Sequence, residues 1–318
     1  MSAAPGFAAI LAARARIAGN VRRTPVLCSD LLDEQLGARL FFKCENLQVT
    51  GAFKARGAFN AVLNLPPALA ARGVVTHSSG NHGAALALAA RSRGIAAYVV
   101  APRTTSARKQ QNMLRYGAKL QLCEPNLAAR QAAAEQIVAA TGATLIHPFD
   151  NADVMAGQGT LALELLEQVP ELDVVVCPIG GGGLISGVAV AAHGVDARIQ
   201  VLGAEPTGAD DARRSCGAGV ITPVAQPQSL ADGLLATLAP STFAVIRTQV
   251  YAVGTVTEAQ IVAAMRQVWE ELKIIIEASS AVPVAALLNG ALQVAGRRVG
   301  VVLTGGNVDL QRLPWKQD

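Results

Sequence analysis

One lysine stands where its surroundings best support amine chemistry. Lys54 ends the segment Asn46-Leu-Gln-Val-Thr-Gly-Ala-Phe-Lys54, which follows an expected strand and runs into an expected helix. Desolvation beside Phe53 and the dipole of a helix N-terminus both favour the neutral form of such an amine. A neutral amine is the form that Schiff-base chemistry requires. The segment alone leaves open an ordinary surface lysine in the first turn of a helix.

Two further strand-to-helix turns have the composition of anion sites. Ser78-Ser-Gly-Asn-His-Gly83 puts small polar residues where backbone N–H groups can bind a carboxylate or a phosphate, with a helix N-cap as the simpler alternative. Pro178-Ile-Gly-Gly-Gly-Gly-Leu184 places four glycines after an apolar strand, which predicts a phosphate-binding turn. This turn does not match GxGxxG and the chain has no Gly-Lys dipeptide, so the dinucleotide fingerprint and the Walker A loop are excluded.

Two other strand ends carry polar groups. Thr304, in Leu303-Thr-Gly-Gly-Asn307, can place one hydroxyl toward a ligand. Two carboxylates of Glu205-Pro-Thr-Gly-Ala-Asp-Asp211, together with an exposed carbonyl, are the ligand types of a hard cation such as Mg²⁺ or Ca²⁺. A solvated acidic loop explains the same spacing equally well.

Apolar runs of strand length alternate with alanine-rich helical stretches, which predicts an α/β fold with parallel sheets. The expected strands are 40–43, 74–77, 97–101, 119–122, 144–146, 174–177, 200–204, 249–253 and 300–303. The expected helices are 52–65, 83–93, 107–116, 127–140, 157–168 and 184–192. Ligands of such folds bind outside the carboxyl ends of the strands, so the residues that follow strands are the informative ones.

Composition narrows the class of protein. The net charge of +4 comes without a long basic run, so there is no nucleic-acid footprint, although it suits a small anionic ligand. Five widely spaced cysteines form no CxxC pair and fit a reducing cytosol, so we expect a cytoplasmic location. The uncharged stretch 174–195 contains Pro178 and four successive glycines, and we interpret it as strand, turn and buried helix rather than as a membrane span.

Together, these segments resemble the fold-type II pyridoxal-phosphate (PLP) enzymes, and most closely their serine/threonine dehydratase (ammonia-lyase) and serine racemase branch. The resemblance extends from Arg22-Arg-Thr-Pro25 to Gly305-Gly-Asn-Val-Asp309. Its most specific parts are Thr50-Gly-Ala-Phe-Lys-Ala-Arg-Gly-Ala58, the serine-rich turn, Ala156-Gly-Gln-Gly-Thr160 and the tetraglycine. It implies a tryptophan synthase β-like fold, in which two parallel-sheet α/β domains hold PLP in the interdomain cleft.

The resemblance also implies roles for the matching residues. Lys54 would carry the Schiff base and move the proton at Cα, and Phe53 would pack against the cofactor ring. Asn81 would bind the 3′-oxygen of the ring, and Thr304 would face the pyridine nitrogen. The implied phosphate cradle is Gly180, Gly181, Gly182 and Gly183. The implied binding loop for the substrate carboxylate is Ser78, Ser79, Gly80, Asn81 and His82. Glu205, the Ala209 carbonyl and Asp211 match a divalent-cation site of this branch, for Mg²⁺ or Ca²⁺.

The implied reaction is α,β-elimination from a β-hydroxy amino acid such as L-threonine or L-serine, giving a 2-oxo acid and ammonia. Ser79 matches the base that faces Lys54 across the substrate in racemases, so a serine racemase or a bifunctional enzyme stays open. Phe149, in His147-Pro-Phe-Asp150, favours the dehydratase. Departures at Ala239 and at Glu277-Ala-Ser-Ser-Ala281 leave hydroxyaspartate or phenylserine open as substrates. A non-catalytic PLP- or amino-acid-binding protein is the alternative from another class.

The resemblance implies a domain organisation as well. Residues 1–70 and 150–318 would form a large PLP-binding domain, and residues 71–149 a small mobile domain. We expect a homodimer and no C-terminal regulatory domain. Closure of the small domain would exclude water and complete the carboxylate site.

Overall fold

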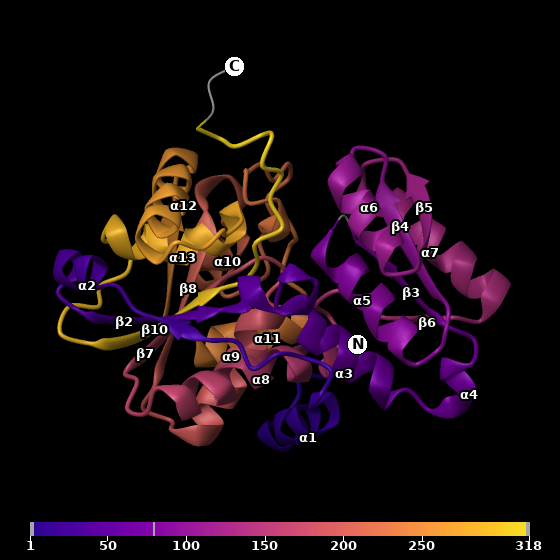
Figure 1. Cartoon of the computed structure of the whole chain (residues 1–318), viewed down its shortest axis with the longest axis horizontal. Helices are drawn as coiled ribbons and strands as arrows, with labels where there is room; N and C mark the ends of the chain where they lie inside the picture. The colour runs from indigo at the N-terminus through magenta and orange to yellow at the C-terminus, as the bar shows by residue number, and fades with distance from the viewer. Residues whose placement is uncertain (1–2, 79, 316–318) are drawn as a thin grey trace.

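The computed structural model describes residues 3–78 and 80–315, and its strands form two separate sheets. Figure 1 shows the two sheets side by side along the long axis of the molecule. We call the segment from β3 to β6 (residues 74–145) the small unit. The six-stranded sheet and the helices that pack on it are the large unit.

The sheet of the large unit draws on both halves of the chain. Its strand order is β1-β2-β10-β7-β8-β9, and every neighbouring pair is parallel except β1 with β2. The strands are β1 Val26–Leu27, β2 Arg39–Cys44, β7 Val174–Pro178, β8 Gln200–Pro206, β9 Ala252–Val256 and β10 Arg298–Leu303. Because β10 lies between β2 and β7, segments that are far apart in the sequence end at one edge of this sheet.

The small unit contains a four-stranded parallel sheet in the order β5-β4-β3-β6. Its strands are β3 Val74–His77, β4 Ala97–Pro102, β5 Ala118–Cys123 and β6 Thr144–Leu145. All four residues of β3 are buried, because helices cover both faces of a parallel sheet of this kind. The helices that belong to it are α5 Asn81–Ser92, α6 Ala107–Arg115 and α7 Leu127–Thr141.

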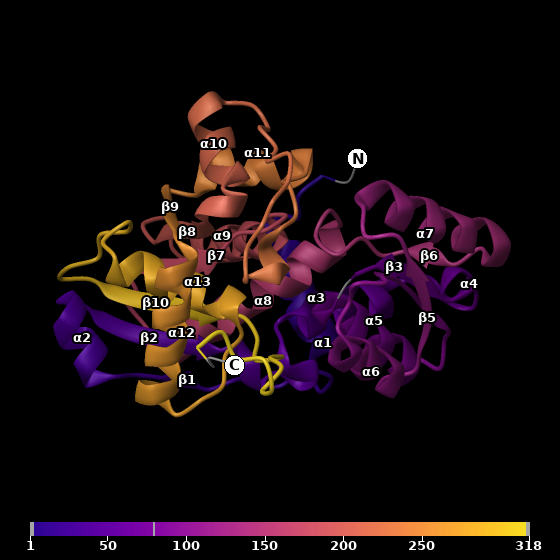
Figure 2. The ribbon, with the colours of Figure 1, turned by 90° about the horizontal axis from the view of Figure 1, so that it is seen from above.

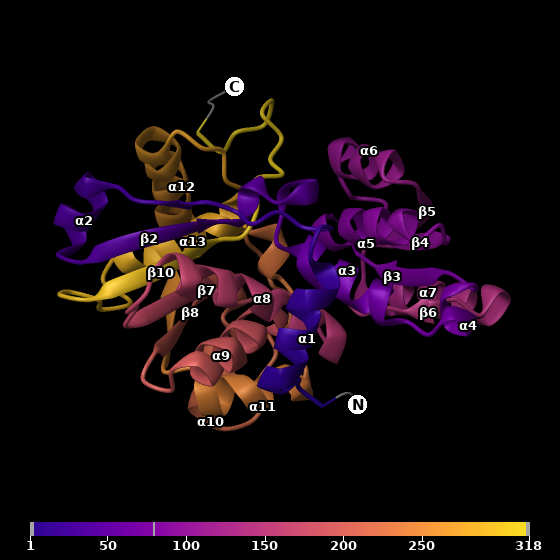
Figure 3. The same cartoon turned by 60° about the horizontal axis from the view of Figure 1, so that its bottom comes forward.

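Helices also cover both faces of the large sheet (Figure 3). One face packs against α2 Asp30–Leu36, α12 Glu258–Leu272 and α13 Ala278–Leu288. The other packs against α1 Phe7–Ile17, α8 Ala152–Gln168, α9 Gly183–Val195, α10 Asp211–Ala218 and α11 Pro240–Gln249. The short helix α4 Pro67–Ala70 follows α3 Lys54–Asn64.

Helix α3 joins the two units. It packs against α8 of the large unit and α5 of the small unit, and Figure 2 shows it at the boundary between them. Its approach to α8 is backbone to backbone: a Cβ atom added to Gly157 would lie 2.5 Å from Arg56 O. Only glycine fits there, so the small residues of Ala156-Gly-Gln-Gly-Thr160 serve close helix packing.

The predicted α/β fold with parallel sheets is confirmed, and the stretch 174–195 is a strand, a turn and a buried helix. Several predicted boundaries differ from the observed ones: β9 is Ala252–Val256 rather than 249–253, and α8 begins at Ala152 rather than at Gly157. Helices α10 to α13 were not expected, although the capping box formed by Thr257 and Gln260 is a sequence signal for the start of α12. Within the described chain, no helix combines the length and the apolar character needed to cross a bilayer.

Candidate active site

The candidate site lies where β2, β7 and β10 end. After β2 the chain forms two short 3₁₀ helices, η1 Glu45–Leu47 and η2 Val49–Gly51. Helix α3 then starts at Lys54, and a bridge between Ala52 and Gly305 ties its entry to the segment after β10. Phe53 N–H also donates to Thr304 O at 2.9 Å. Lys54 and Thr304 therefore belong to the same edge of the large sheet.

The amine of Lys54 has no acidic partner among the described residues. Its Nζ donates to Pro148 O at 2.8 Å and lies 5.1 Å from the centre of the Phe53 ring. Burial lowers the pKa of Lys54 to about 8, because an unpaired ammonium is poorly solvated inside protein. A larger neutral fraction of the amine follows, as the sequence predicts.

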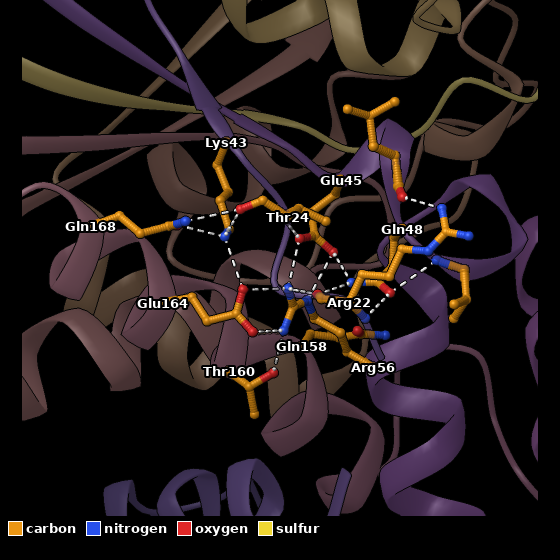
Figure 4. A network of polar contacts seen from close by, with 12 residues as sticks. Arg22, Thr24, Lys43, Glu45, Gln48, Arg56, Gln158, Thr160, Glu164 and Gln168 are labelled. Carbon is orange, nitrogen blue, oxygen red and sulfur yellow. Dashed lines mark hydrogen bonds and ion pairs between the residues drawn. The ribbon is translucent and has the colours of Figure 1, made fainter. Parts of the chain in front are cut away.

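A buried network of charges, drawn in Figure 4, holds α3 directly behind Lys54. Arg56 is fully buried, and its guanidinium donates to both carboxylate oxygens of Glu45 and both of Glu164, at 2.8 Å in each case. Lys43 Nζ donates to Glu164 Oε2 at 2.9 Å. Two cations and two carboxylates thus compensate one another in a region where any unpaired charge would be costly.

The pKa values within this network show how the pairing works. Burial lowers the pKa of Lys43, and the carboxylate of Glu164 opposes that shift. Burial alone would raise the pKa of Glu164, but its hydrogen bonds to Arg56 and Lys43 bring the pKa below the ordinary value. Lys43 and Glu164 thus stabilise each other's charged forms, and the hydrogen bonds of the network fix the position of α3 relative to β2 and α8.

Replacing Arg56 with Met should strongly destabilise the protein, because it strands the Glu45 and Glu164 carboxylates without their main partner. We expect a loss of about 3–5 kcal/mol in the free energy of unfolding, measured by urea titration. The matched control is Arg14→Met, which breaks the exposed pair of Arg14 with Glu167 on α8 and should cost less than about 1 kcal/mol. Equal losses in the two variants would contradict the role of the buried network.

The tetraglycine forms a close-fitting turn between β7 and α9. A Cβ on Gly181 would lie 2.5 Å from the ring of Phe149, and one on Gly180 would lie 3.0 Å from Gly233 O. Gly182 has a φ of 83°, a conformation that favours glycine. It is the N-cap of α9 and has no side chain that could accept a hydrogen bond from the first N–H groups of the helix. The first N–H groups of α9 have no intrahelical partners, so the turn can bind an anion.

The turn after β3 lies on the small unit. Ser78 Oγ accepts hydrogen bonds from the N–H groups of Gly80 and Gly83, at 3.2 and 3.1 Å, and so shapes the entry to α5. Ser79 lies outside the described residues. The imidazole of His82 is buried and faces Ile146 O at 3.4 Å, and burial holds its pKa well below the ordinary value. The Nδ1 atom of this ring is buried without a hydrogen-bond partner among the described residues.

Asn81, at the start of α5, reaches across to the large unit. Its Nδ2 donates to Glu277 Oε1 at 2.8 Å, and its Oδ1 accepts from Asn307 Nδ2 at 2.9 Å. Burial and the nearby Asp232 raise the pKa of Glu277 to about 7. No role was assigned to Glu277 or Asn307 from the sequence, because their approach to Asn81 depends on how the two units meet.

The raised pKa of Glu277 predicts a pH-dependent stability. Its folded pKa lies above the value of 4.5 expected when unfolded, so its contribution is fully present below pH 4.5 and is lost as the pH rises to about 7. In Glu277→Gln, we expect this decline in the free energy of unfolding to be weaker than in the wild type. Urea titrations at several pH values between 4.5 and 8 measure the difference. Parallel curves for the two proteins would show that Glu277 has an ordinary pKa.

The hydroxyl of Thr304 lies in a small buried network at the same edge of the large sheet as Lys54. Thr304 Oγ1 lies 3.1 Å from Ser280 Oγ, and Ser280 in turn donates to Gly305 O at 2.7 Å and accepts from Gly305 N–H at 2.8 Å. Ser280 belongs to the departure Glu277-Ala-Ser-Ser-Ala281. Its hydroxyl therefore orients the residue that was expected to face a ligand.

Glu205, near the end of β8, and Asp211, which follows this strand, are buried rather than solvated. Both oxygens of Glu205 accept backbone hydrogen bonds, from Ala212 N–H at 3.0 Å and Arg213 N–H at 2.9 Å. Asp211 accepts from Leu238 N–H at 2.9 Å. Burial raises the pKa of Glu205 to about 8 and that of Asp211 to about 6. Across the described chain, no three His, Cys, Asp or Glu side chains gather into a metal-binding group.

Comparison with known proteins agrees with this arrangement. The family model described as "Pyridoxal-phosphate dependent enzyme" matches residues 17–305, which is most of the chain. The chain belongs to this family. It is 49% identical over 311 residues to a beta-hydroxyaspartate dehydratase from Paracoccus denitrificans, covering 98% of this chain and 99% of that protein. It is 48% identical to a serine racemase from Arabidopsis thaliana, covering 94% and 92% of the two chains.

Solved structures of family members have the same fold. The structure of maize serine racemase matches with a TM-score of 0.95 and 45% identity, over 97% of this chain and 95% of that one. The structure of a threonine deaminase from T.th. matches with a TM-score of 0.90 and 39% identity, over 96% and 99% of the two chains. The predicted fold-type II PLP fold is confirmed.

The residues present fit the family's cofactor, PLP. The tetraglycine leaves a turn in which any Cβ would collide with Phe149, Gly233 or Thr242, and its amides suit a phosphate. Lys54 supplies an amine with a lowered pKa at the same edge of the sheet. Thr304 supplies a neutral hydroxyl, held by Ser280, for a ring nitrogen.

Proposed function

We propose that the chain is a PLP-dependent dehydratase (ammonia-lyase) that converts a β-hydroxy amino acid to a 2-oxo acid and ammonia. The observation that carries the proposal is the unpaired amine of Lys54, with its pKa near 8, beside the tetraglycine turn. A binding protein without catalysis would not need a reactive amine there. The dehydratase and deaminase names of several relatives support the same activity.

Each residue then has a defined task. Lys54 Nζ takes the proton from the substrate Cα, while the amides of Gly180 to Gly183 hold the cofactor phosphate. Phe53 packs against the ring, and Asn81 keeps one amide N–H beyond its bond to Glu277 for the ring's 3′-oxygen. Thr304 presents a neutral hydroxyl to the ring nitrogen. Bound PLP supplies an electron sink for negative charge at Cα.

The turn from Ser78 to His82, including Ser79, would bind the α-carboxylate through its amides and hydroxyls. Loss of the Cα proton and the β-hydroxyl releases water, and the enamine that remains hydrolyses to the 2-oxo acid and ammonia.

We further propose that residues 71–149 move as a small domain and close against residues 1–70 and 150–318. This closure would exclude water from the reacting atoms. A homodimer remains part of this proposal.

A divalent cation, Mg²⁺ or Ca²⁺, is proposed at Glu205, the Ala209 carbonyl and Asp211. Two buried carboxylates of raised pKa are a poor arrangement without a cation and a good one with it. Such an ion would brace the turn after β8 rather than take part in proton transfer.

One observation favours a dicarboxylic substrate such as hydroxyaspartate. Arg130, in the first turn of α7, has a buried Nε without a hydrogen-bond partner among the described residues. Together with burial, its charge lowers the pKa of His77, the last residue of β3. A second carboxylate on the substrate would satisfy this cation. The serine racemase names of other relatives, and Ser79, support racemisation as a second activity.

Purified holoenzyme should release 2-oxo acid from at least one of L-serine, L-threonine and hydroxyaspartate, with more turnover after Mg²⁺ is restored to chelated protein. Lys54→Ala should lose activity by at least about 10³-fold, because proton transfer at Cα loses its base. Its unfolding transition should stay near that of the wild type.

Folded, coloured wild-type protein that turns over none of these substrates would favour the non-catalytic binding protein. A chiral assay for D-serine tests separately for racemisation.

Arg130→Met separates the candidate substrates. If Arg130 binds a distal carboxylate, kcat/KM for hydroxyaspartate should fall by about 10- to 100-fold, the value of one charged hydrogen-bonded contact. Activity on serine, which has no distal carboxylate, should change little. A matched control is Arg103→Met, at the end of β4, where the arginine pairs with Glu124 on the surface. An equal loss on both substrates would argue against this contact.

A further inference from the structure

One ion pair crosses between the two units in the described part of the chain. Lys109, in α6 of the small unit, pairs with Asp232 of the large unit. Asp232 begins the 3₁₀ helix η4 Asp232–Leu234. No other ion pair of the described residues joins residues 74–145 to the rest of the chain. Neither residue was singled out by its position in the sequence.

The lysine end of the pair lies over the turn that follows β3. A Cβ atom added to Gly80 would lie 3.3 Å from Cδ and 3.5 Å from Cε of Lys109. The aliphatic stem therefore covers Gly80, whose N–H donates to Ser78 Oγ. Only 22% of the Lys109 side chain is exposed, so the stem is held against the protein rather than extended into solvent.

The acidic end of the pair lies behind the tetraglycine. Gly233 O and Leu234 Cα would each be 3.0 Å from a Cβ on Gly180, so η4 is in close contact with the first glycine of the turn. Gly233 N–H donates to Ser279 Oγ at 3.3 Å, which anchors η4 to α13. The pair thus connects the turn proposed to bind the substrate carboxylate with the segment that supports the phosphate turn.

We propose that Lys109 and Asp232 are a positioning pair that holds the β3–α5 turn over the tetraglycine turn and so favours the substrate-binding arrangement of the two units. The inference rests on the proposed function. Neither side chain needs to touch the reacting atoms: the pair acts through Gly80 on one side and Gly180 on the other. Its effect belongs to binding, because an equilibrium between apposed and separated units reduces apparent affinity in proportion to the separated fraction.

The size of the effect follows from exposure. Asp232 is 54% exposed, so water and salt screen the pair and limit its strength. We expect Lys109→Met and Asp232→Asn each to raise the KM for the preferred substrate by about two- to fivefold, with kcat within about twofold of the wild type. The wild-type KM should rise with ionic strength, and the variants should lose most of that dependence.

A double-mutant cycle distinguishes the pair from a direct contact between Lys109 and the substrate. The double variant should resemble either single variant, and Lys109→Arg should recover most of the loss. Arg108→Met, an exposed cation on the same helix, is the matched control and should behave as wild type. If Lys109→Met raises KM and Asp232→Asn leaves it unchanged, or if the two effects add, the positioning pair is refuted.

Hydrogen exchange of the holoenzyme tests the pair without turnover. The amides of Gly80 and Gly83 should exchange faster in Lys109→Met and in Asp232→Asn than in the wild type, and Arg108→Met should show no change. Unchanged exchange in both variants would overturn the proposal even if the wild type is active. Faster exchange in a protein that turns over no β-hydroxy amino acid would support the pair and reject the proposed reaction.

Discussion

The compensation of charge around Arg56 is the interaction on which the site depends. Its guanidinium satisfies two carboxylates that come from the end of β2 and from α8, and Lys43 completes the balance. Lys54, whose amine is proposed to react, begins the same helix only two residues earlier. A shift of α3 would therefore unpair buried charges at once. Because any other position of α3 would leave buried charges unpaired at a large cost in free energy, the fold holds Lys54 in a fixed position.

Lys43 and Lys54 are two lysines whose surroundings favour opposite protonation states. Burial lowers the pKa of both. Lys43 meets a carboxylate and two further oxygens, which stabilise its ammonium form. Lys54 meets a single backbone carbonyl and no acid among the described residues. The first arrangement suits a structural cation and the second suits a nucleophile, because only an unpaired amine loses its proton readily.

Much of the large-unit site could be predicted from local sequence. Strand ends followed by glycine-rich turns indicated Lys54, the tetraglycine and Thr304, because parallel strands bring such turns to one edge. The partners that tune these residues could not be predicted. Glu277 and Asn307 meet Asn81 only after the two units come together, and Ser280 meets Thr304 across more than twenty residues of chain. No local pattern encodes these distances.

The position of β10 between β2 and β7 has a consequence for biogenesis. All the other strands leave the ribosome before it, yet β2 and β7 make no direct pairing with each other and must wait for the last strand to arrive. The small-unit sheet, whose strands are contiguous in the chain, can assemble during translation. Until then, the nascent large unit carries two apolar strands with unpaired edges. Such edges can bind a chaperone or pair with another chain.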